Sequence, residues 1–278
     1  MHCPIIDCHC HIYPEKIALK AVESISEFYH LPMCYDGRLE TLLSASKENG
    51  VTHSVIFSVA TKPAQVRSIN RFIAEMVAQN PNRFIGLGTL HPDSETIQEE
   101  VEEIIRLGLK GVKLHPDIQG IALDDKRCDK IYQACEGVLP VLVHAGDSRY
   151  DYSNPNRLKN VLEKYPKLTV IGAHFAGYSV WDEAEKQLSG YKNLYVDCSS
   201  SLALITKEKA LKIIRTYGAE RVLYATDFPM WSFEEELKRI QALGLTKKEK
   251  QQIFYKNACA LFGLDEKVIE QQAQENRR

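Results

Sequence analysis

Two histidines separated by one residue, His9 and His11, are the first groups in the chain whose type and spacing indicate chemistry. They lie in residues 5–12, a run with β-branched residues at its start and Pro14 just beyond it, which predicts a strand. Side chains alternate between the two faces of a strand, so Asp7, His9 and His11 share one face. The two histidines are roughly 6.6 Å apart along the strand, close enough to lean onto one metal ion. Such a pair is weak evidence by itself.

Further histidines stand at the carboxyl ends of later apolar runs, and this convergence carries more weight than the pair. Six of the nine histidines occupy such positions: His9, His11, His91, His115, His144 and His174. Asp227 ends the last run. Random placement would not crowd so many potential metal ligands at strand ends.

The elements that must position these groups are short apolar strands alternating with helices. The predicted strands cover residues 5–12, 53–59, 84–90, 111–116, 140–146, 168–174, 194–199 and 222–229. The predicted helices cover residues 15–30, 38–49, 64–79, 94–107, 126–136, 155–165, 180–189, 206–217, 233–243 and 247–262. Eight strand–helix units predict an α/β protein with a single (β/α)8 TIM-barrel domain over residues 1–264. Residues 265–278 are expected to form a polar, fraying tail.

In a (β/α)8 barrel all strand carboxyl ends meet at one mouth, where active sites form. Strand alternation places His144, His174 and Asp227 on faces that would point inward, towards His9 and His11. Gly172 and Ala225 would then leave space one layer below the mouth. The histidines and the aspartate are therefore expected to gather in one site.

Composition limits the class of protein. The 278 residues carry 35 basic and 37 acidic side chains, and a net charge of −2 gives no reason to expect nucleic acid or an anionic membrane as a partner. No apolar run is long enough for a membrane span, and the first residues do not resemble a signal peptide. The expectation is a cytoplasmic protein with a small-molecule substrate, with homo-oligomer formation left open.

Eight cysteines are scattered along the chain, and without an export signal they are expected to be thiols. The alternative is a structural zinc site on Cys3, Cys8 and Cys10. Their spacing does not fit paired zinc ligands, and alternation turns Cys8 and Cys10 away from His9 and His11.

Several motifs together resemble the amidohydrolase superfamily. They are Asp7-x-His9-x-His11, Val143-His144-Ala145-Gly146, Gly172-Ala-His174-Phe-Ala-Gly177 and Thr226-Asp227-Phe-Pro229, with residues 111–116 and 257–262 in support. The chain is most similar to the amidohydrolase-related branch that includes aminocarboxymuconate semialdehyde decarboxylase, and the resemblance extends over nearly the whole chain. Substrates vary widely within the superfamily, so the family alone does not determine the reaction.

The resemblance implies that His9, His11, His144 and Asp227 bind one divalent metal ion, expected to be Zn²⁺ with Mn²⁺ as the alternative. His174 matches the family's histidine that acts without holding the metal, and a fifth ligand is the alternative role. Imidazoles and a carboxylate suit zinc, and an open position would hold water. Asp7 is expected to support a metal-bound imidazole, since such rings usually need a carboxylate or carbonyl partner.

Further residues are candidates for contact with the substrate: Lys113, His115, Arg149 and Trp231. In two-metal members of the superfamily a carbamylated lysine bridges the ions, so a two-metal site using Lys113 stays open. His91 is a further candidate at the mouth.

The preferred functional prediction is a hydrolase that uses metal-activated water on an amide, lactone or ester, with His174 or Asp227 moving the proton. The first alternative is metal-dependent, non-oxidative decarboxylation of an unsaturated or aromatic carboxylic acid. A non-catalytic metal-binding protein is the second alternative. Nothing in the sequence separates hydrolase from decarboxylase.

Overall fold

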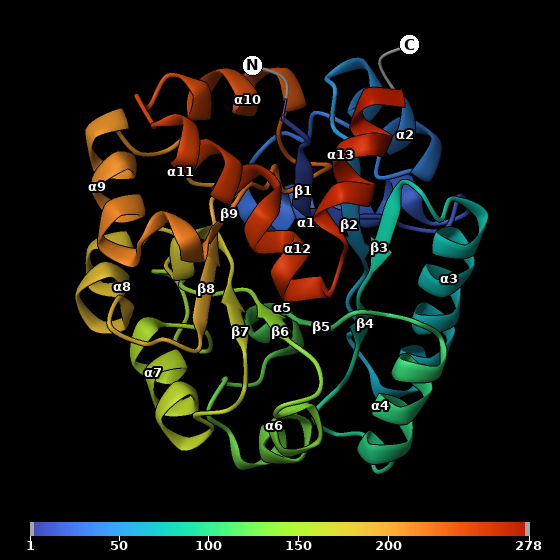
Figure 1. Ribbon diagram of the computed structural model, residues 1–278. Coiled ribbons are helices and arrows are strands. Elements are labelled where there is room, and N and C mark those ends of the chain that lie inside the picture. The colour runs from blue at the N-terminus through green and yellow to red at the C-terminus, as the bar shows by residue number, and fades with distance from the viewer. Residues whose placement is uncertain (1–2, 276–278) are drawn as a thin grey trace.

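A computed structural model describes residues 3–275 of the chain and has the predicted (β/α)8 barrel as a single domain (Figure 1). Its strands are β1 (Ile6–His11), β2 (His53–Phe57), β3 (Phe84–Gly86), β4 (Gly88–Thr89), β5 (Val112–Leu114), β6 (Val141–Val143), β7 (Val170–Gly172), β8 (Leu194–Asp197) and β9 (Val222–Leu223). All neighbouring strands pair in parallel, in chain order. The fold prediction is confirmed.

One predicted strand, residues 84–90, is divided into β3 and β4 at Leu87. The backbone still connects the two halves of the barrel, because Leu87 N–H donates to Ile56 O at 3.0 Å and Gly88 N–H donates to Gly111 O at 2.9 Å. The other junction lies between β1 and the β9 segment, where Cys8 N–H donates to Tyr224 O at 2.9 Å. These contacts close the barrel.

The helices surround the barrel and lie over its two ends. They are α1 (Ala18–Tyr29), α2 (Leu39–Glu48), α3 (Val66–Gln79), α4 (Ile97–Arg106), α5 (Pro116–Gln119), α6 (Asp129–Cys135), α7 (Pro155–Lys164), α8 (Trp181–Leu188), α9 (Lys207–Tyr217), α10 (Phe233–Gln241), α11 (Lys247–Gln251), α12 (Asn257–Phe262) and α13 (Glu266–Glu275). A π-helical turn over Gln252–Lys256 joins α11 to α12, so the helix predicted over 247–262 is one continuous run with altered pitch. Within the described residues, no helix is both long and apolar enough to cross a bilayer.

The carboxyl-terminal tail differs from its prediction. Residues 266–275 form α13 and do not fray, because Ile269 and Ala273 are buried against the barrel. Tyr255 Oη–H also donates to Glu270 Oε1 at 2.7 Å, which ties the helix to the preceding π-helical turn. Residues 276–278 of the predicted tail, like residues 1–2, lie outside the described part of the chain.

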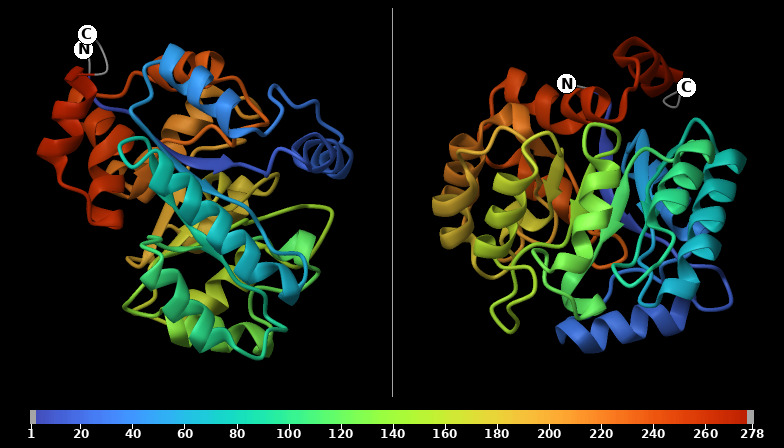
Figure 2. Two further views of the ribbon diagram at one scale, coloured as in Figure 1. Left: turned by 90° about the vertical axis from the view of Figure 1, so that its right-hand side faces the viewer. Right: turned by 90° about the horizontal axis from the view of Figure 1, so that it is seen from below.

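Helix α1 is set apart from the ring of helices. It follows β1 and lies across the end of the barrel opposite α12 and α13 (Figure 2). Only Ala18 and Val22 of this helix are buried. Because β1 runs towards that end, α1 lies on the side where the strand carboxyl ends open.

A buried carboxylate fastens the first barrel strand to the last. Asp7 is fully buried and accepts hydrogen bonds from Thr226 N at 3.0 Å, Thr226 Oγ1 at 2.5 Å and His9 N at 3.1 Å. Asp7 therefore holds backbone, and the prediction that it supports an imidazole ring is wrong. A buried carboxylate needs such donors to offset its desolvation.

We expect Asp7→Ala to lower the free energy of unfolding by about 3 kcal/mol, because it leaves several buried donors without an acceptor. Thr226→Val should cost about 1–2 kcal/mol, and the double variant should cost less than the sum, since both changes remove the same bond. Urea unfolding of the metal-free protein measures all three. Additive costs would show that the side-chain bond contributes nothing, and Thr169→Val, on a partly exposed residue before β7, serves as the control.

Candidate metal centre

Three ligand atoms converge at the carboxyl ends of the first and last barrel strands. His9 Nε2 and His11 Nε2 lie 3.2 Å apart, and Asp227 Oδ1 lies 3.3 Å from the former and 3.6 Å from the latter. All three atoms lie within 4.8 Å of one another, close enough to share one ion. The strand alternation predicted for His9 and His11 accounts for this convergence.

The ring of His9 is oriented by Asp197, which ends β8. His9 Nδ1 lies 2.9 Å from Asp197 Oδ2, and both residues are buried. A carboxylate accepts only, so Nδ1 carries the proton and Nε2 presents its lone pair to the mouth. Burial also lowers the pKa of His9 well below its usual range, which keeps the ring neutral as a metal ligand requires.

His174 is held by a left-handed turn directly after β7. His174, Phe175 and Ala176 have φ values of 60°, 55° and 58°, a region that L-residues seldom occupy in succession. The His174 N–H donates to Asp197 Oδ1 at 3.0 Å, and the Trp181 indole N–H donates to His174 O at 3.1 Å.

The same turn gives Gly172 a different role from the one predicted. A Cβ on Gly172 would lie 2.5 Å from the Cβ of Ala176, so glycine lets the turn fold back onto β7. The space that its missing side chain leaves is filled by the turn.

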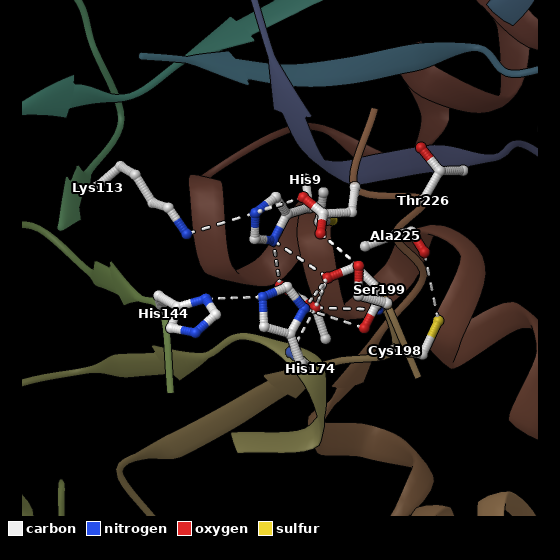
Figure 3. A network of polar contacts seen from close by, with 12 residues as sticks. His9, Lys113, His144, His174, Cys198, Ser199, Ala225 and Thr226 are labelled. Carbon is white, nitrogen blue, oxygen red and sulfur yellow. Dashed lines mark hydrogen bonds and ion pairs between the residues drawn. The ribbon is translucent and has the colours of Figure 1, made fainter. Parts of the chain in front are cut away.

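His144 and His174 face each other through one nitrogen each (Figure 3). His174 Nδ1 lies 3.0 Å from Ser199 O, and His144 Nε2 lies 3.1 Å from Gly146 O. Carbonyl oxygens accept only, so these nitrogens carry the protons. His144 Nδ1 and His174 Nε2 are then left with lone pairs facing each other at 3.0 Å.

Facing lone pairs repel unless a cation or a proton donor lies against them. His9, His144 and His174 each direct their N–H away from the mouth and a bare nitrogen into it. This donor set fits a divalent ion, since neutral imidazoles and a carboxylate are its common ligands. His11 and Asp227 complete the set of residues that could hold it.

Asp227 is positioned by a short chain of hydrogen bonds. Trp231 Nε1–H donates to Ser200 Oγ at 2.8 Å, and Ser200 Oγ–H donates to Asp227 Oδ2 at 2.5 Å. This leaves Oδ1 for the mouth. Burial raises the pKa of Asp227 to about 6. Trp231, predicted to contact substrate, is instead placed where it orients the aspartate.

Lys113 places a cation beside the ligand cluster. Its side chain is fully buried, with Nζ 3.4 Å from His9 Nε2 and 5.2 Å from the centre of the Phe57 ring. Burial lowers the pKa of Lys113 to about 8, and the nearby carboxylates of Asp197 and Asp227 oppose that shift. The lysine predicted to contact substrate thus faces the same chamber as the metal ligands.

A tyrosine from α1 closes the other side. Tyr29 Oη lies 2.8 Å from His115 Nε2 and 3.5 Å from His144 Nδ1. The rings of His115 and His144 stack, with centres 4.1 Å apart and planes inclined by 8°. Tyr29 therefore brings a hydroxyl from a helix outside the barrel to the edge of the site.

These groups enclose a chamber of about 30 Å³. Its walls are formed by His9, His11, Ile25, Tyr29, Met33, Lys113, His115, Ile118, His144, His174, Asp227, Pro229 and Met230. The four predicted metal ligands and the predicted catalytic histidine all line this chamber, together with Lys113 and His115. Of these residues, only His9, His11 and Asp227 bring three ligand atoms within 4.8 Å of one another, and His144 is not part of that cluster.

Two other predicted residues lie outside the chamber walls. Arg149, proposed to hold a substrate carboxylate, already pairs with Asp147 at 2.7 Å and lies over the rings of Phe28 and Tyr29. Its guanidinium is committed to the loop after β6. His91 accepts from Asp93 N–H at 3.2 Å and caps a turn.

Asp197, Ser199 and Tyr29 contribute to the site without having been predicted. Asp197 is an acid at a strand carboxyl end, so the rule that selected Asp227 could also have selected it. Ser199 accepts from His174 Nδ1 at 2.9 Å and follows Asp197 by two residues. Tyr29 has no such signal, because it belongs to a helix whose place over the mouth depends on the tertiary fold.

The barrel and its ligand cluster define a metal-dependent TIM-barrel enzyme. The chain belongs to the amidohydrolase family, whose model matches residues 6–264. It is 27% identical over 259 residues to the 2-amino-3-carboxymuconate-6-semialdehyde decarboxylase of Dictyostelium discoideum, covering 77% of this chain and 72% of that relative. It is 23% identical to the gamma-resorcylate decarboxylase of Polaromonas sp., over 72% of this chain and 76% of the relative. The predicted family branch is confirmed.

A solved structure supports the fold. The dihydroxybenzoic acid decarboxylase of Polaromonas sp. JS666, solved with bound manganese and the inhibitor 2-nitroresorcinol, superimposes with a TM-score of 0.73 and is 16% identical in sequence. The match covers 94% of this chain and 97% of that one.

The preferred prediction of a hydrolase is wrong in the light of these relatives, which are decarboxylases. The physical reason for the error is that imidazole and carboxylate ligands around one ion serve both reactions. The residues from which the hydrolase was predicted do not distinguish a water nucleophile from a bound carboxylate.

We expect one tightly held divalent ion per chain. His9→Asn should weaken its binding because a direct ligand is lost, whereas His174→Asn should keep the ion and the fold. Metal analysis of the purified variants after manganese or zinc loading measures this. Release of the ion by His174→Asn as readily as by His9→Asn would make His174 a ligand, and two ions per chain would favour a bridging Lys113.

We expect Asp197→Asn to weaken metal binding by about 10- to 100-fold, because the amide no longer fixes the proton on His9 Nδ1. Competition with a fluorescent chelator measures the affinity. Asp93→Asn is the matched control, since its exposed carboxylate pairs with Arg127 at 3.0 Å outside the chamber walls. Equal affinities for both variants would refute a role for Asp197.

Proposed function

We propose that this protein is a metal-dependent, non-oxidative decarboxylase of an aromatic or unsaturated carboxylic acid. The observation that carries the proposal is a buried lysine beside a cluster of metal ligands: Lys113 Nζ lies 3.4 Å from His9 Nε2. The lysine and the divalent ion that this cluster would bind are two neighbouring positive charges, and they suit a substrate that arrives as a carboxylate. The decarboxylase relatives support the same conclusion.

Binding of the acid depends on charge within a small chamber whose walls are largely buried. A divalent ion held by His9, His11, His144 and Asp227 would bind oxygen atoms of the substrate and withdraw electron density from it. Lys113 supplies a second positive charge, and its burial strengthens the attraction for a carboxylate. The Tyr29 hydroxyl, at the chamber edge, can donate to a further substrate oxygen.

Two residues move protons. His174 Nε2 bears a lone pair, so it accepts a hydrogen bond from a hydroxyl group of the substrate. Asp227, whose Oδ1 faces the mouth, would relay a proton to the carbon that bears the carboxylate, and a C–H bond forms there. The C–C bond to the carboxylate then breaks, its electron pair returns to the carbon skeleton, and CO2 leaves.

The relatives support manganese as the metal, in place of the zinc expected from the sequence. Manganese is bound in the dihydroxybenzoic acid decarboxylase from Polaromonas sp.. Ligands of nitrogen and oxygen, without thiolate, suit Mn²⁺ as well as Zn²⁺. We therefore propose manganese as the ion to load first.

We expect the manganese-loaded protein to release CO2 from members of a panel of hydroxybenzoates and unsaturated acids, including 2,6-dihydroxybenzoate. His174→Asn should lower kcat by about 10²–10⁴-fold while the metal stays bound. A coupled CO2 assay and metal analysis measure the two effects. Absence of CO2 release from the whole panel, with metal bound, would contradict the proposal.

His30→Asn is the matched control for this variant. His30 is exposed at the end of α1 with φ of 55°, and His174 has φ of 60°, so both substitutions place Asn in the left-handed region that it tolerates. A comparable loss of kcat in His30→Asn would show that the effect is not specific to the chamber.

A further inference from the structure

An apolar groove opens from the catalytic chamber and runs between α1 and α3. Its volume is about 580 Å³, against about 30 Å³ for the chamber, and it falls within the range of about 300–1,000 Å³ common for small-molecule sites. His11, Ile25, His115 and Ile118 line both spaces. The groove is therefore continuous with the proposed active site.

The chamber is too small for the carbon skeleton of its own substrate. A space of this size holds about one water molecule. The carboxylate end of the acid can reach into it, but the ring or chain that bears the carboxylate must extend past His11 and His115. These shared walls continue into the groove, so the rest of the substrate would lie there.

The groove wall on α1 is a stripe that the rest of the protein leaves open. Ile17, Ala21, Ile25 and Phe28 recur at helical spacing and face the groove, whereas the buried residues of α1 are Ala18 and Val22. Ile17 is 50% exposed, so the outer end of this stripe faces solvent, and a contiguous apolar surface left open in this way is typical of a binding site.

The opposite wall comes from α3. Ile69 and Phe72 line the groove, while Val66, Asn70 and Ile73 of the same helix are buried towards the barrel. Among the described residues that line the groove, none is Asp, Glu, Lys or Arg. Hydroxyl and amide side chains also line it, namely Ser24, Ser58, Thr61, Gln65 and Ser68. The groove therefore favours uncharged groups, and its walls on α1 and α3 favour apolar ones, in contrast to the charged groups of the chamber at its inner end.

We propose that the substrate is an acid with an extended apolar substituent, alkyl or aryl, which lies in this groove while the carboxylate occupies the chamber. This proposal rests on the proposed decarboxylase function for the identity of the reacting end. It goes beyond that function by defining the other end. Ring carboxylates without such a substituent would leave most of the groove unfilled.

Binding of a series of 4-alkylbenzoates, from methyl to heptyl, to the manganese-loaded protein tests the proposal by calorimetry. Affinity should rise by about two- to fourfold for each added methylene, the upper value corresponding to about 0.8 kcal/mol per buried methylene. An affinity that does not change with chain length would overturn the proposal.

Two variants of α1 locate the effect. Ala21→Trp fills the groove and should abolish the dependence on chain length, with binding of 4-methylbenzoate changed less. Leu19→Trp adds the same side chain to the same helix at a position that is 58% exposed and outside the groove lining, so it should keep the dependence. Ile69→Trp fills the groove from α3 and guards against a local defect in α1. An unchanged dependence in both Ala21→Trp and Ile69→Trp would refute the assignment.

The experiment separates this proposal from the proposed function. Affinity that rises with chain length, without CO2 release from any acid, would support the groove and contradict the decarboxylase. Release of CO2 from hydroxybenzoates, with an affinity for alkylbenzoates that does not depend on chain length, would support the decarboxylase and contradict the groove assignment. Sedimentation of the wild type and Ala21→Trp gives a further outcome: a dimer lost in the variant, with affinities independent of chain length, would assign the groove to a second copy and overturn the proposal.

Discussion

The carboxylate of Asp197 accepts hydrogen bonds from His9 Nδ1 at 2.9 Å, from the His174 N–H at 3.0 Å and from Ser199 Oγ at 2.5 Å. It thereby connects β1, the turn after β7 and the end of β8 at the level of the mouth. The bond to His9 sets the tautomer of a metal ligand, and the bond to His174 holds a left-handed turn in place. The nitrogen that His9 presents to the chamber and the position of the His174 ring therefore both depend on this one buried acid.

Left-handed backbone recurs where strand ends meet the site. His174, Ser200 and Asp227 have φ values of 60°, 44° and 63°. Each residue lies after a barrel strand and turns the chain so that a side chain or hydroxyl faces another polar group of the site. Such conformations cost free energy in non-glycine residues, and the surrounding hydrogen bonds offset that cost. The site is thus assembled by strained turns on a regular barrel.

Much of this arrangement could be predicted from the sequence, because strand alternation and barrel closure are properties of the pattern. They bring His9, His11, His144, His174 and Asp227 to one chamber without any knowledge of distances. The division of residues 84–90 into two strands and the ordering of α13 could not be predicted, since both depend on contacts between distant segments. The role of Tyr29 could not be predicted either, because the sequence around it has the pattern of an ordinary amphipathic helix.

The amphipathic stripe of α1 illustrates why function was harder to predict than fold. A helical apolar stripe normally indicates a face buried in the core, and here part of that stripe borders a groove continuous with the chamber. The ligand types at the mouth suit several reactions, so they do not define the substrate. What distinguishes one member of such a family from another is the space beyond the ligands: a buried lysine that favours a carboxylate, and walls whose polarity determines what the carboxylate is attached to.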